Sequence, residues 1–406
     1  MREKWVKRTI SDLLECSIGG VWGDDPGSSE VDVHVYRQTE FDDDGKLTMP
    51  SEAVRSITKS QLKSRALQPG DVLMQKSAGT PSLPGRVVRV RDGIENHATC
   101  SNFLQLLRAD QSVCTSDFLF WLLWLGHKTG KAFEFQRGTN IRNLDLNQYL
   151  IQPVLLPPLE DQMRIVDLLE AVDEYVASLQ RHADAARKVR NAVLHELLTA
   201  GGEDWVETTL GEVAIWGSGG TPKADEASFY GGNIPWCVIG DLTEGEVWDT
   251  RDSITEEGLA NSSAKIVERG AIFIAMYGAS IGRTGMASRP MATNQAIAFA
   301  YPDSTLLDNL FLLIFLQTQK PKFIQAGQGA AQSNISQTVL KKWPILLPPL
   351  TEQLRIASIV SCADDLIRAT ESAISAAKSL RSGLSSDLLS GEHEIPDSYD
   401  RLLGAA

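Results

Sequence analysis

Two long stretches of the chain carry apolar residues in the spacing of paired helices. In the first stretch, residues seven apart form one row from Ile165, and a second row starts four residues later at Leu169. The rows consist of Ile165, Val172, Leu179, Ala186 and Val193, and of Leu169, Val176, Ala183, Arg190 and Leu197. This two-row pattern predicts a long helix over 159–200 that packs against another helix.

The second stretch repeats the pattern 191 residues later, and its helix is expected over 350–391. Its rows consist of Ile356, Ala363, Thr370, Ala377 and Leu384, and of Val360, Ile367, Ile374, Arg381 and Leu388. The polar interruption Arg190 is repeated as Arg381. We expect the two helices to form an antiparallel coiled coil with a pseudo-twofold axis, and small residues such as Gly383 to permit close approach. The alternative is that each helix packs on its own domain.

A nearly identical string opens each helix. Residues 155–165 read LLPPLEDQMRI and residues 346–356 read LLPPLTEQLRI, with eight of eleven positions identical. Proline is tolerated just before a helix but not inside one, and acids such as Glu160 and Glu352 favour a first turn. Similarity continues upstream, with Gly70 and Gly270 in matching strings, so the chain consists of two copies of one unit of about 195 residues.

Each copy begins with a domain of mixed character. Short apolar or β-branched runs bounded by glycine and polar residues, such as GDVLMQ at 70–75 and GAIFIAMYG at 270–278, predict strands. One apolar helix is expected in each domain, around Phe118 and around Leu310. The predicted fold class is α+β, with two tandem domains separated by the long helices. The predicted boundaries are 1–158, 159–200 for the central helix, 201–349, 350–391 for the second helix and 392–406 for a tail.

Composition excludes several classes of protein. The 406 residues contain 43% hydrophobic and 22% charged residues, which is ordinary for a globular chain. The longest apolar run, FLFWLLWL, is far too short to span a bilayer. The five cysteines form no CxxC pair, so we expect neither a zinc site nor a disulfide framework, and a cytoplasmic location fits.

Charge is unevenly distributed along the chain. The formal net charge of −13 opposes general attraction to nucleic acid. However, the segment from Arg55 to Arg91 holds eight basic residues and one acid, and 309–351 holds four lysines and no acid. Such patches are often solvated faces, but their presence in both copies favours two equivalent contacts with an anionic partner.

Motifs with a known catalytic mechanism are absent from the sequence. No GxxxxGK[ST] loop, dinucleotide-binding fingerprint, HExxH or spaced Cys/His set occurs. The string LLPPL is not the Asn/Asp-Pro-Pro-aromatic motif of amino-methyltransferases. We therefore expect no catalytic residue, no metal site and no cofactor bound by this chain.

The paired strings and the duplication resemble the specificity subunit of type I restriction–modification systems. The resemblance covers nearly the whole chain and is carried mainly by LPPLEDQMRI and LPPLTEQLRI. The string GSGGTPKADEASFYGGNIPWCVIGDL at 217–242 is similar to the opening of many target-recognition domains. The first domain departs from this pattern with SIGGVWGDDPGSSEVDVHVYR.

The resemblance implies a DNA-binding, non-catalytic subunit of a restriction system used in antiviral defence. Each target-recognition domain would read one half of a split, asymmetric site in double-stranded DNA, and the paired helices would set the spacing and dock methyltransferase subunits. Through these the chain would join restriction and translocase subunits. The partners would use S-adenosylmethionine, ATP and Mg²⁺.

Candidate DNA contacts are cations and polar loop residues, because cations bind phosphates and polar side chains read base edges. In the first domain they are Lys76, Ser77, Arg137, Asn140 and Arg142, and in the second Thr221, Lys223, Tyr277, Ser280, Arg283, Gln332, Ser333 and Asn334. Asn140 is expected to correspond to Asn334. Ordinary loop polarity is the alternative for each residue. Trp236 is expected in the core and not as a platform for a base.

Two other functions remain open from the residues alone. A coiled-coil scaffold that binds only protein would share the helix pattern, and loss of the basic patches would leave its binding unchanged. A nuclease or methyltransferase with an unrecognised site would show activity as a purified chain. The target bases and the gap between half-sites cannot be obtained from the sequence.

Overall fold

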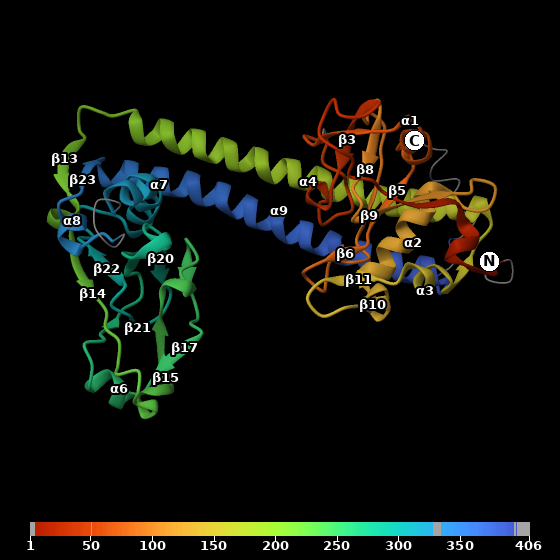
Figure 1. The fold of residues 1–406 in the computed structure, drawn as a ribbon. Helices are drawn as coiled ribbons and strands as arrows, with labels where there is room; N and C mark the ends of the chain where they lie inside the picture. The colour runs from red at the N-terminus through yellow and green to blue at the C-terminus, as the bar shows by residue number, and fades with distance from the viewer. Residues whose placement is uncertain (1–4, 50, 328–333, 394, 396–406) are drawn as a thin grey trace. The chain divides into compact units, whose positions relative to one another are not determined.

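The computed structural model describes residues 5–49, 51–327, 334–393 and 395. The chain divides into two compact units, of which the first comprises 1–181 with 371–406 and the second comprises 182–370. Both boundaries lie inside the long helices, so each unit holds one domain and part of each helix (Figure 1).

The two long helices are α4 (Leu159–Thr199) and α9 (Leu350–Ser390), and they pack together. Their pairing is antiparallel, as the contacts inside each unit show. In unit 1, Arg381 of α9 forms an ion pair with Asp173 of α4. In unit 2, Arg190 of α4 forms an ion pair with Asp364 of α9 at 3.0 Å.

These two ion pairs are equivalent, with the roles of the repeats exchanged. Arg190 corresponds to Arg381, and Asp173 corresponds to Asp364, at the same offset of 191 residues. The predicted apolar rows are confirmed, because every position in them is buried or half-buried. The expectation for Gly383 is wrong: a Cβ atom at this residue would have nothing within 4 Å, so the residue is not needed for close helix approach.

The domain of unit 1 is built on a four-stranded sheet with the order β2-β9-β5-β7, all antiparallel. A second sheet has the order β4-β3-β8, and small sheets join β10-β11-β6 and β1-β12. The strands are β1 (Val6–Thr9), β2 (Leu14–Gly19), β3 (Val31–Tyr36), β4 (Val54–Ile57), β5 (Val72–Gln75), β6 (Ser77–Ala78), β7 (Val87–Arg89), β8 (Ala98–Cys100), β9 (Leu104–Ala109), β10 (Gln136–Arg137), β11 (Arg142–Leu144) and β12 (Pro153–Leu156). The helices of this domain are α1 (Lys59–Arg65), α2 (Ser116–Lys128) and α3 (Leu146–Leu150).

The core of unit 1 lies between the four-stranded sheet and α2. Phe118 and Trp121 of α2 are almost fully buried against strand residues such as Val72. The same core contains Ile165 of α4 and Leu388 of α9. The ends of both long helices are therefore part of the interior of the domain, as their apolar rows require.

Unit 2 repeats this architecture. Its five-stranded sheet has the order β14-β22-β19-β20-β16, in which the first four strands correspond to β2-β9-β5-β7. Its second sheet is β17-β15-β21-β18, and β13 pairs with β23. The strands are β13 (Val206–Thr209), β14 (Ala214–Ser218), β15 (Tyr230–Cys237), β16 (Glu246–Val247), β17 (Asp252–Ile254), β18 (Ile266–Val267), β19 (Ile272–Ala275), β20 (Thr284–Ala287), β21 (Met291–Thr293), β22 (Ile297–Pro302) and β23 (Pro344–Leu347). The helices of this domain are α5 (Leu210–Val213), α6 (Glu256–Ala260), α7 (Asn309–Gly327) and α8 (Gln337–Lys341).

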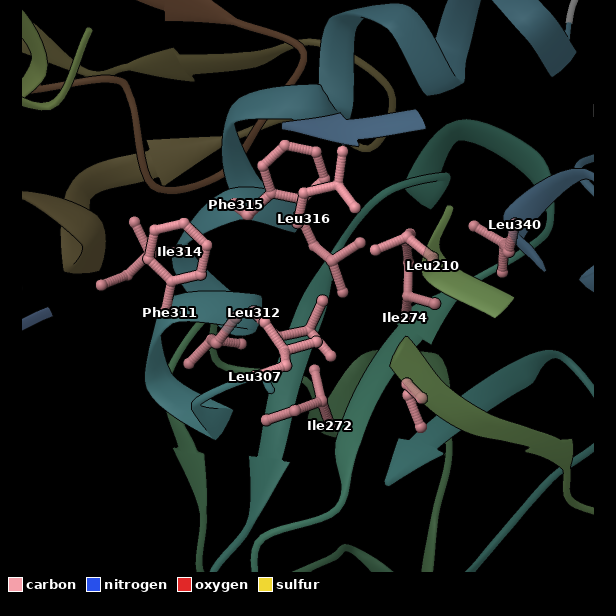
Figure 2. Close-up of a cluster of buried hydrophobic side chains, with 14 of the residues drawn as sticks. Leu210, Ile272, Ile274, Leu307, Phe311, Leu312, Ile314, Phe315, Leu316 and Leu340 are labelled. Carbon is pink, nitrogen blue, oxygen red and sulfur yellow. The ribbon is translucent and has the colours of Figure 1, made fainter. Parts of the chain in front are cut away.

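The core of unit 2 lies between its sheet and α7. Figure 2 shows Phe311 and Leu312 of α7 among the side chains around Ile272 and Ile274 of β19. The predicted apolar helices are thus α2 and α7, and the predicted strands include β5 and β19. The α+β fold with two domains and a pair of long helices is confirmed.

The repeated glutamine of the LPPL strings joins each long helix to its domain. Gln162 is fully buried and accepts a hydrogen bond from the Thr115 amide at 2.9 Å, while its Nε2 donates to the carbonyls of Val113 and Pro157. Gln353 makes the same three bonds with Asp308, Leu306 and Pro348. One side chain therefore fixes the turn before the domain helix to the proline turn before the long helix.

Replacing Gln162 by Ala should open this junction. The buried Thr115 amide and two carbonyls would lose their partners, each at a cost of about 1–3 kcal/mol. We expect amide hydrogen exchange in a peptide covering 111–118 to accelerate more than tenfold, measured by mass spectrometry. Gln148→Ala, at an exposed position on α3, is the control. Equal exchange rates in the two variants would contradict this role.

Candidate nucleic-acid interface

In unit 1, a small sheet brings together candidate residues that lie far apart in the sequence. Strand β11 pairs with β10 on one side and with β6 on the other, so Asn143 lies opposite both Arg137 and Ser77. The Leu144 amide also donates to the carbonyl of Lys76 at 2.8 Å. Lys76, Ser77, Arg137 and Arg142 therefore share one edge of the domain, and Asn140 is exposed in the turn between β10 and β11.

The cations on this edge are only partly neutralised. Lys76 is half-buried, and among the described residues no carboxylate lies within ion-pair distance of its ammonium group. Burial lowers the pKa of Lys76 below its ordinary value. Arg142 is half-buried, and its buried Nε has no hydrogen-bond partner in the described part of the chain. Arg137 pairs with Asp145 at 2.9 Å, but three-quarters of its side chain stays exposed.

A bound phosphate would supply what this edge lacks. A partly desolvated ammonium or guanidinium group gains most from an anion that it can hydrogen-bond directly. Ser77 donates a hydrogen bond to Asn143 Oδ1 at 2.6 Å, which orients an amide beside these cations. The edge thus combines positive charge with polar groups able to read bases.

In unit 2, three loops meet at the matching edge of the five-stranded sheet. The Gly220 amide donates to the carbonyl of Thr293 at 2.9 Å, and the Met276 amide donates to the carbonyl of Ala296 at 2.9 Å. An isolated bridge joins Tyr277 to Asn334. The loops that carry Thr221, Lys223, Tyr277, Ser280, Arg283 and Asn334 are therefore neighbours. Gln332 and Ser333 lie outside the described residues.

The side chains on this edge are open to solvent or half-buried. Thr221 donates a hydrogen bond to Gln295 Oε1, and Lys223 is exposed. Tyr277 is 42% exposed. Arg283 is half-buried, and within the described ranges its guanidinium group forms no ion pair. As in unit 1, a half-buried positive group has no carboxylate partner in the described part of the chain.

The expected match between Asn140 and Asn334 is wrong. The Ile335 amide donates to the Met276 carbonyl, as the Leu144 amide does to the Lys76 carbonyl. Asn334 therefore corresponds to Asn143, at the same offset of 191 that relates the LPPL strings. Counting this offset backwards from those strings without a gap would have found Asn143, which the sequence prediction missed.

Two further polar residues at these edges were also missed. Gln295 accepts the hydrogen bond from Thr221. Arg65 of α1 donates from Nε to the carbonyl of Gly19 at 2.9 Å.

Arg65 lies within the basic segment 55–91, but the cations of that segment do not form one surface. Arg89 is 3% exposed and pairs with Asp117 and, at 2.6 Å, with Glu170 of α4. This arginine joins the domain to the long helix.

Glycines hold the loop that precedes Thr221. A Cβ atom at Gly220 would lie 2.2 Å from Ser263 Oγ, and the Gly220 carbonyl accepts a hydrogen bond from Trp236 Nε1 at 3.1 Å. Trp236 is 8% exposed and packs in a hydrophobic cluster, so its predicted place in the core is confirmed. In unit 1, Gly20 approaches the carbonyl of Cys100 as Gly219 approaches that of Thr293, although the surrounding sequence differs.

No group of three or more His, Cys, Asp or Glu side chains among the described residues could hold a metal ion. The cysteines are free, and no helix within the described ranges is long and apolar enough to cross a membrane.

A family model and the curated relatives agree on the class of protein that this chain resembles. Residues 202–377 match the family model described as the type I restriction modification DNA specificity domain. The chain is 24% identical over 387 residues to the putative type I restriction enzyme MjaX specificity subunit of Methanocaldococcus jannaschii, covering 90% of this chain and 88% of the relative. It is 26% identical to the EcoR124I/EcoR124II specificity subunit of Escherichia coli, covering 50% of this chain and 52% of the relative.

Solved structures share the fold. A chain from a study of complex assembly and conformational transition of the type I R-M system aligns over 96% of this chain and 98% of its own length, with a TM-score of 0.64 and 22% identity. The type I restriction-modification S subunit from M. genitalium aligns over 97% of both chains, with a TM-score of 0.57 and 16% identity.

Replacing Gly220 by Ala should disturb the interface loop of unit 2. The added methyl group would clash with Ser263 and displace the carbonyl that holds Trp236. Forcing atoms into a filled space costs about 1–3 kcal/mol, which corresponds to a thermal midpoint lowered by about 5 °C. Calorimetry should show this shift but none for Gly245→Ala, where no atom lies within 4 Å. Equal midpoints would show that the loop has room to adjust.

Proposed function

We propose that this chain, which belongs to the specificity subunits of type I restriction–modification systems, selects the DNA sequence on which its partner subunits act. The observation that carries the proposal is the repetition of one domain with one kind of edge. In each copy, separate loops bring a half-buried cation, with no carboxylate partner among the described residues, beside polar side chains. Two such edges account for a site with two half-sites.

Local charge explains how an acidic protein can bind DNA. The net charge of −13 gives no general attraction, so binding depends on the few cations at the two edges. Lys76, Arg142 and Arg283 would contact phosphates, and Ser77, Asn143, Thr221 and Asn334 would read base edges. Binding of this kind favours sequence selection over general affinity.

Partner subunits would dock on exposed apolar residues of the long helices. Met163, Tyr175 and Val189 of α4 correspond to Leu354, Leu366 and Leu380 of α9, and each of the six is more than half exposed. Three matched apolar positions are unusual on a solvated face, and their repetition suits two copies of one partner. We assign these exposed positions to contacts with methyltransferase subunits, and through them with restriction and translocase subunits.

The chemistry would then belong to the partners. We expect this chain to be non-catalytic and to bind no cofactor, while S-adenosylmethionine, ATP and Mg²⁺ act in the other subunits. Among the described residues, no group of three or more His, Cys, Asp or Glu side chains could hold a metal ion for such chemistry. Such a complex would work in the cytoplasm, where the DNA substrate lies.

Neutralising the edge cations should weaken DNA binding. Lys76→Gln and Arg283→Gln each remove one phosphate contact, so the slope of log affinity against log salt should become shallower by about 0.9. Binding would be measured for the complex with its methyltransferase subunits, on DNA carrying the site identified by methylation mapping. Lys188→Gln, at an exposed position on α4, is the control.

The same assay tests the two-domain division of the site. Scrambling either half-site should abolish tight binding by the unsubstituted complex. Unchanged affinity and unchanged salt dependence in both charge variants would contradict the proposed edges. A complex that assembles but does not distinguish scrambled DNA would instead indicate a protein-binding scaffold.

Charges on the apolar positions of the helices should block assembly. Met163→Glu and Leu354→Glu each place a carboxylate on a surface that a partner must desolvate, which should weaken association at least tenfold. Pull-down and analytical ultracentrifugation with the methyltransferase subunit would measure this loss. Ser372→Glu, at an exposed polar position on α9, should assemble normally. Normal assembly of both apolar-site variants would move the docking surface elsewhere.

A further inference from the structure

The turn between β10 and β11 of unit 1 presents an isoleucine to solvent. Ile141 is 57% exposed, although isoleucine is among the residues most often buried. It lies between the exposed Asn140 and the half-buried Arg142. An apolar side chain in the middle of a polar, cationic edge does not contribute to the core of its own domain.

The backbone of this turn is held in place by several contacts. Gly138 has a φ of +99°, and a Cβ atom there would lie 2.3 Å from the carbonyl oxygen of Ile141. The same carbonyl accepts a hydrogen bond from Asn143 Nδ2 at 3.3 Å, and Asn143 Oδ1 accepts one from Ser77 at 2.6 Å. Ile141 is therefore presented from a fixed turn, which reduces the entropy lost when a partner covers it.

The shape and charge of the segment suit a groove of duplex DNA. Strands β10 and β11 form an antiparallel hairpin whose other neighbour is β6, and the major groove admits two antiparallel strands. Arg137 and Arg142 flank its tip and can contact the phosphates on either side. The one apolar group that the major groove offers is the C5 methyl of thymine.

We propose that Ile141 contacts the C5 methyl of a thymine and so specifies one A·T pair in the half-site read by unit 1. This inference rests on the proposed function, because it requires unit 1 to bind DNA by this edge. Ile141 would add specificity where the neighbouring cations add only affinity. The expected gain is that of burying one methyl group, about fourfold in affinity.

The test removes the methyl group from the DNA and the isoleucine from the protein. Each thymine of both half-sites is replaced singly by deoxyuridine, on either strand, and the assembled complex is titrated with each duplex. For the unsubstituted protein, one replacement should weaken binding about fourfold. For Ile141→Ala, binding to the normal site should be weaker by a similar factor, and that one replacement should have no further effect.

A matched variant separates this contact from a general effect of lost apolar surface. Ile151→Ala truncates another isoleucine of unit 1, which is 54% exposed and follows α3. It should keep full sensitivity to every deoxyuridine replacement. Both variants change exposed side chains, so each should fold with an unaltered thermal midpoint.

Several results would overturn the proposal, and they differ from failure of the function. If the complex binds its site but no thymine methyl contributes, or the same methyl contributes equally in Ile141→Ala, the contact does not exist. If the half-site read by unit 1 contains only G·C pairs, the proposed contact with a thymine does not exist either. Weaker binding of Ile141→Ala to the methyltransferase subunit, with unchanged DNA binding, would assign the residue to a protein interface. Loss of all site-specific binding by the unsubstituted complex would instead refute the proposed function.

Discussion

The fold of both units depends on the pairing of α4 with α9. In each unit, an arginine fixes that pairing. Arg381 is 4% exposed and lies 5.0 Å over the ring of Trp124, with Asp173 and Asp44 as its ion-pair partners. Burial alone would raise the pKa of Asp44, but Arg381 and Lys378 lower it below its ordinary value. A buried guanidinium group is costly without such partners, so a shift of the helices by one turn would leave it unpaired. The apolar rows supply affinity between the helices, and the arginines define their register.

This pairing also determines where the two loop edges can be built. Gln162 and Gln353 connect the helix starts to the turns before α2 and α7, and those helices support the sheets whose loops form the edges. A residue at an edge is thus connected to a long helix through one sheet and one buried amide. The loops can differ in sequence between the two copies, as Lys76 and Met276 do, because the contacts that hold them come from glycines and main-chain groups. Variation in the side chains of these loops should therefore cost little in stability.

Much of this could be predicted from the sequence because it depends on periodic patterns. Rows of apolar residues seven apart define helix faces, and the repeated strings define equivalent turns, so the helices and the duplication followed directly. The edges could not be assembled in the same way, since the pairing of β6 with β11 joins residues 77 and 143 through long-range contacts. Local sequence similarity between the two copies predicted Asn140 as the counterpart of Asn334, whereas the strand pairing identifies Asn143. Counting charges also wrongly included Arg89 among the cations available to an anionic partner. The sequence does not distinguish a cation that faces solvent from one that forms an ion pair between a sheet and a helix.

The division of each long helix between two units has a consequence for synthesis on the ribosome. Residues 182–370 complete unit 2, whereas unit 1 also requires residues from 371 onward, which are made after unit 2. Most of unit 1 precedes unit 2 in the sequence, yet unit 1 can only finish folding after unit 2 has its full sequence. Until then Ile165 and Leu169 lack Leu388 and Leu389, which lie in the same core. The nascent chain must therefore carry an uncovered apolar row while the residues between 169 and 388 are made, a period in which chaperone binding would compete with aggregation.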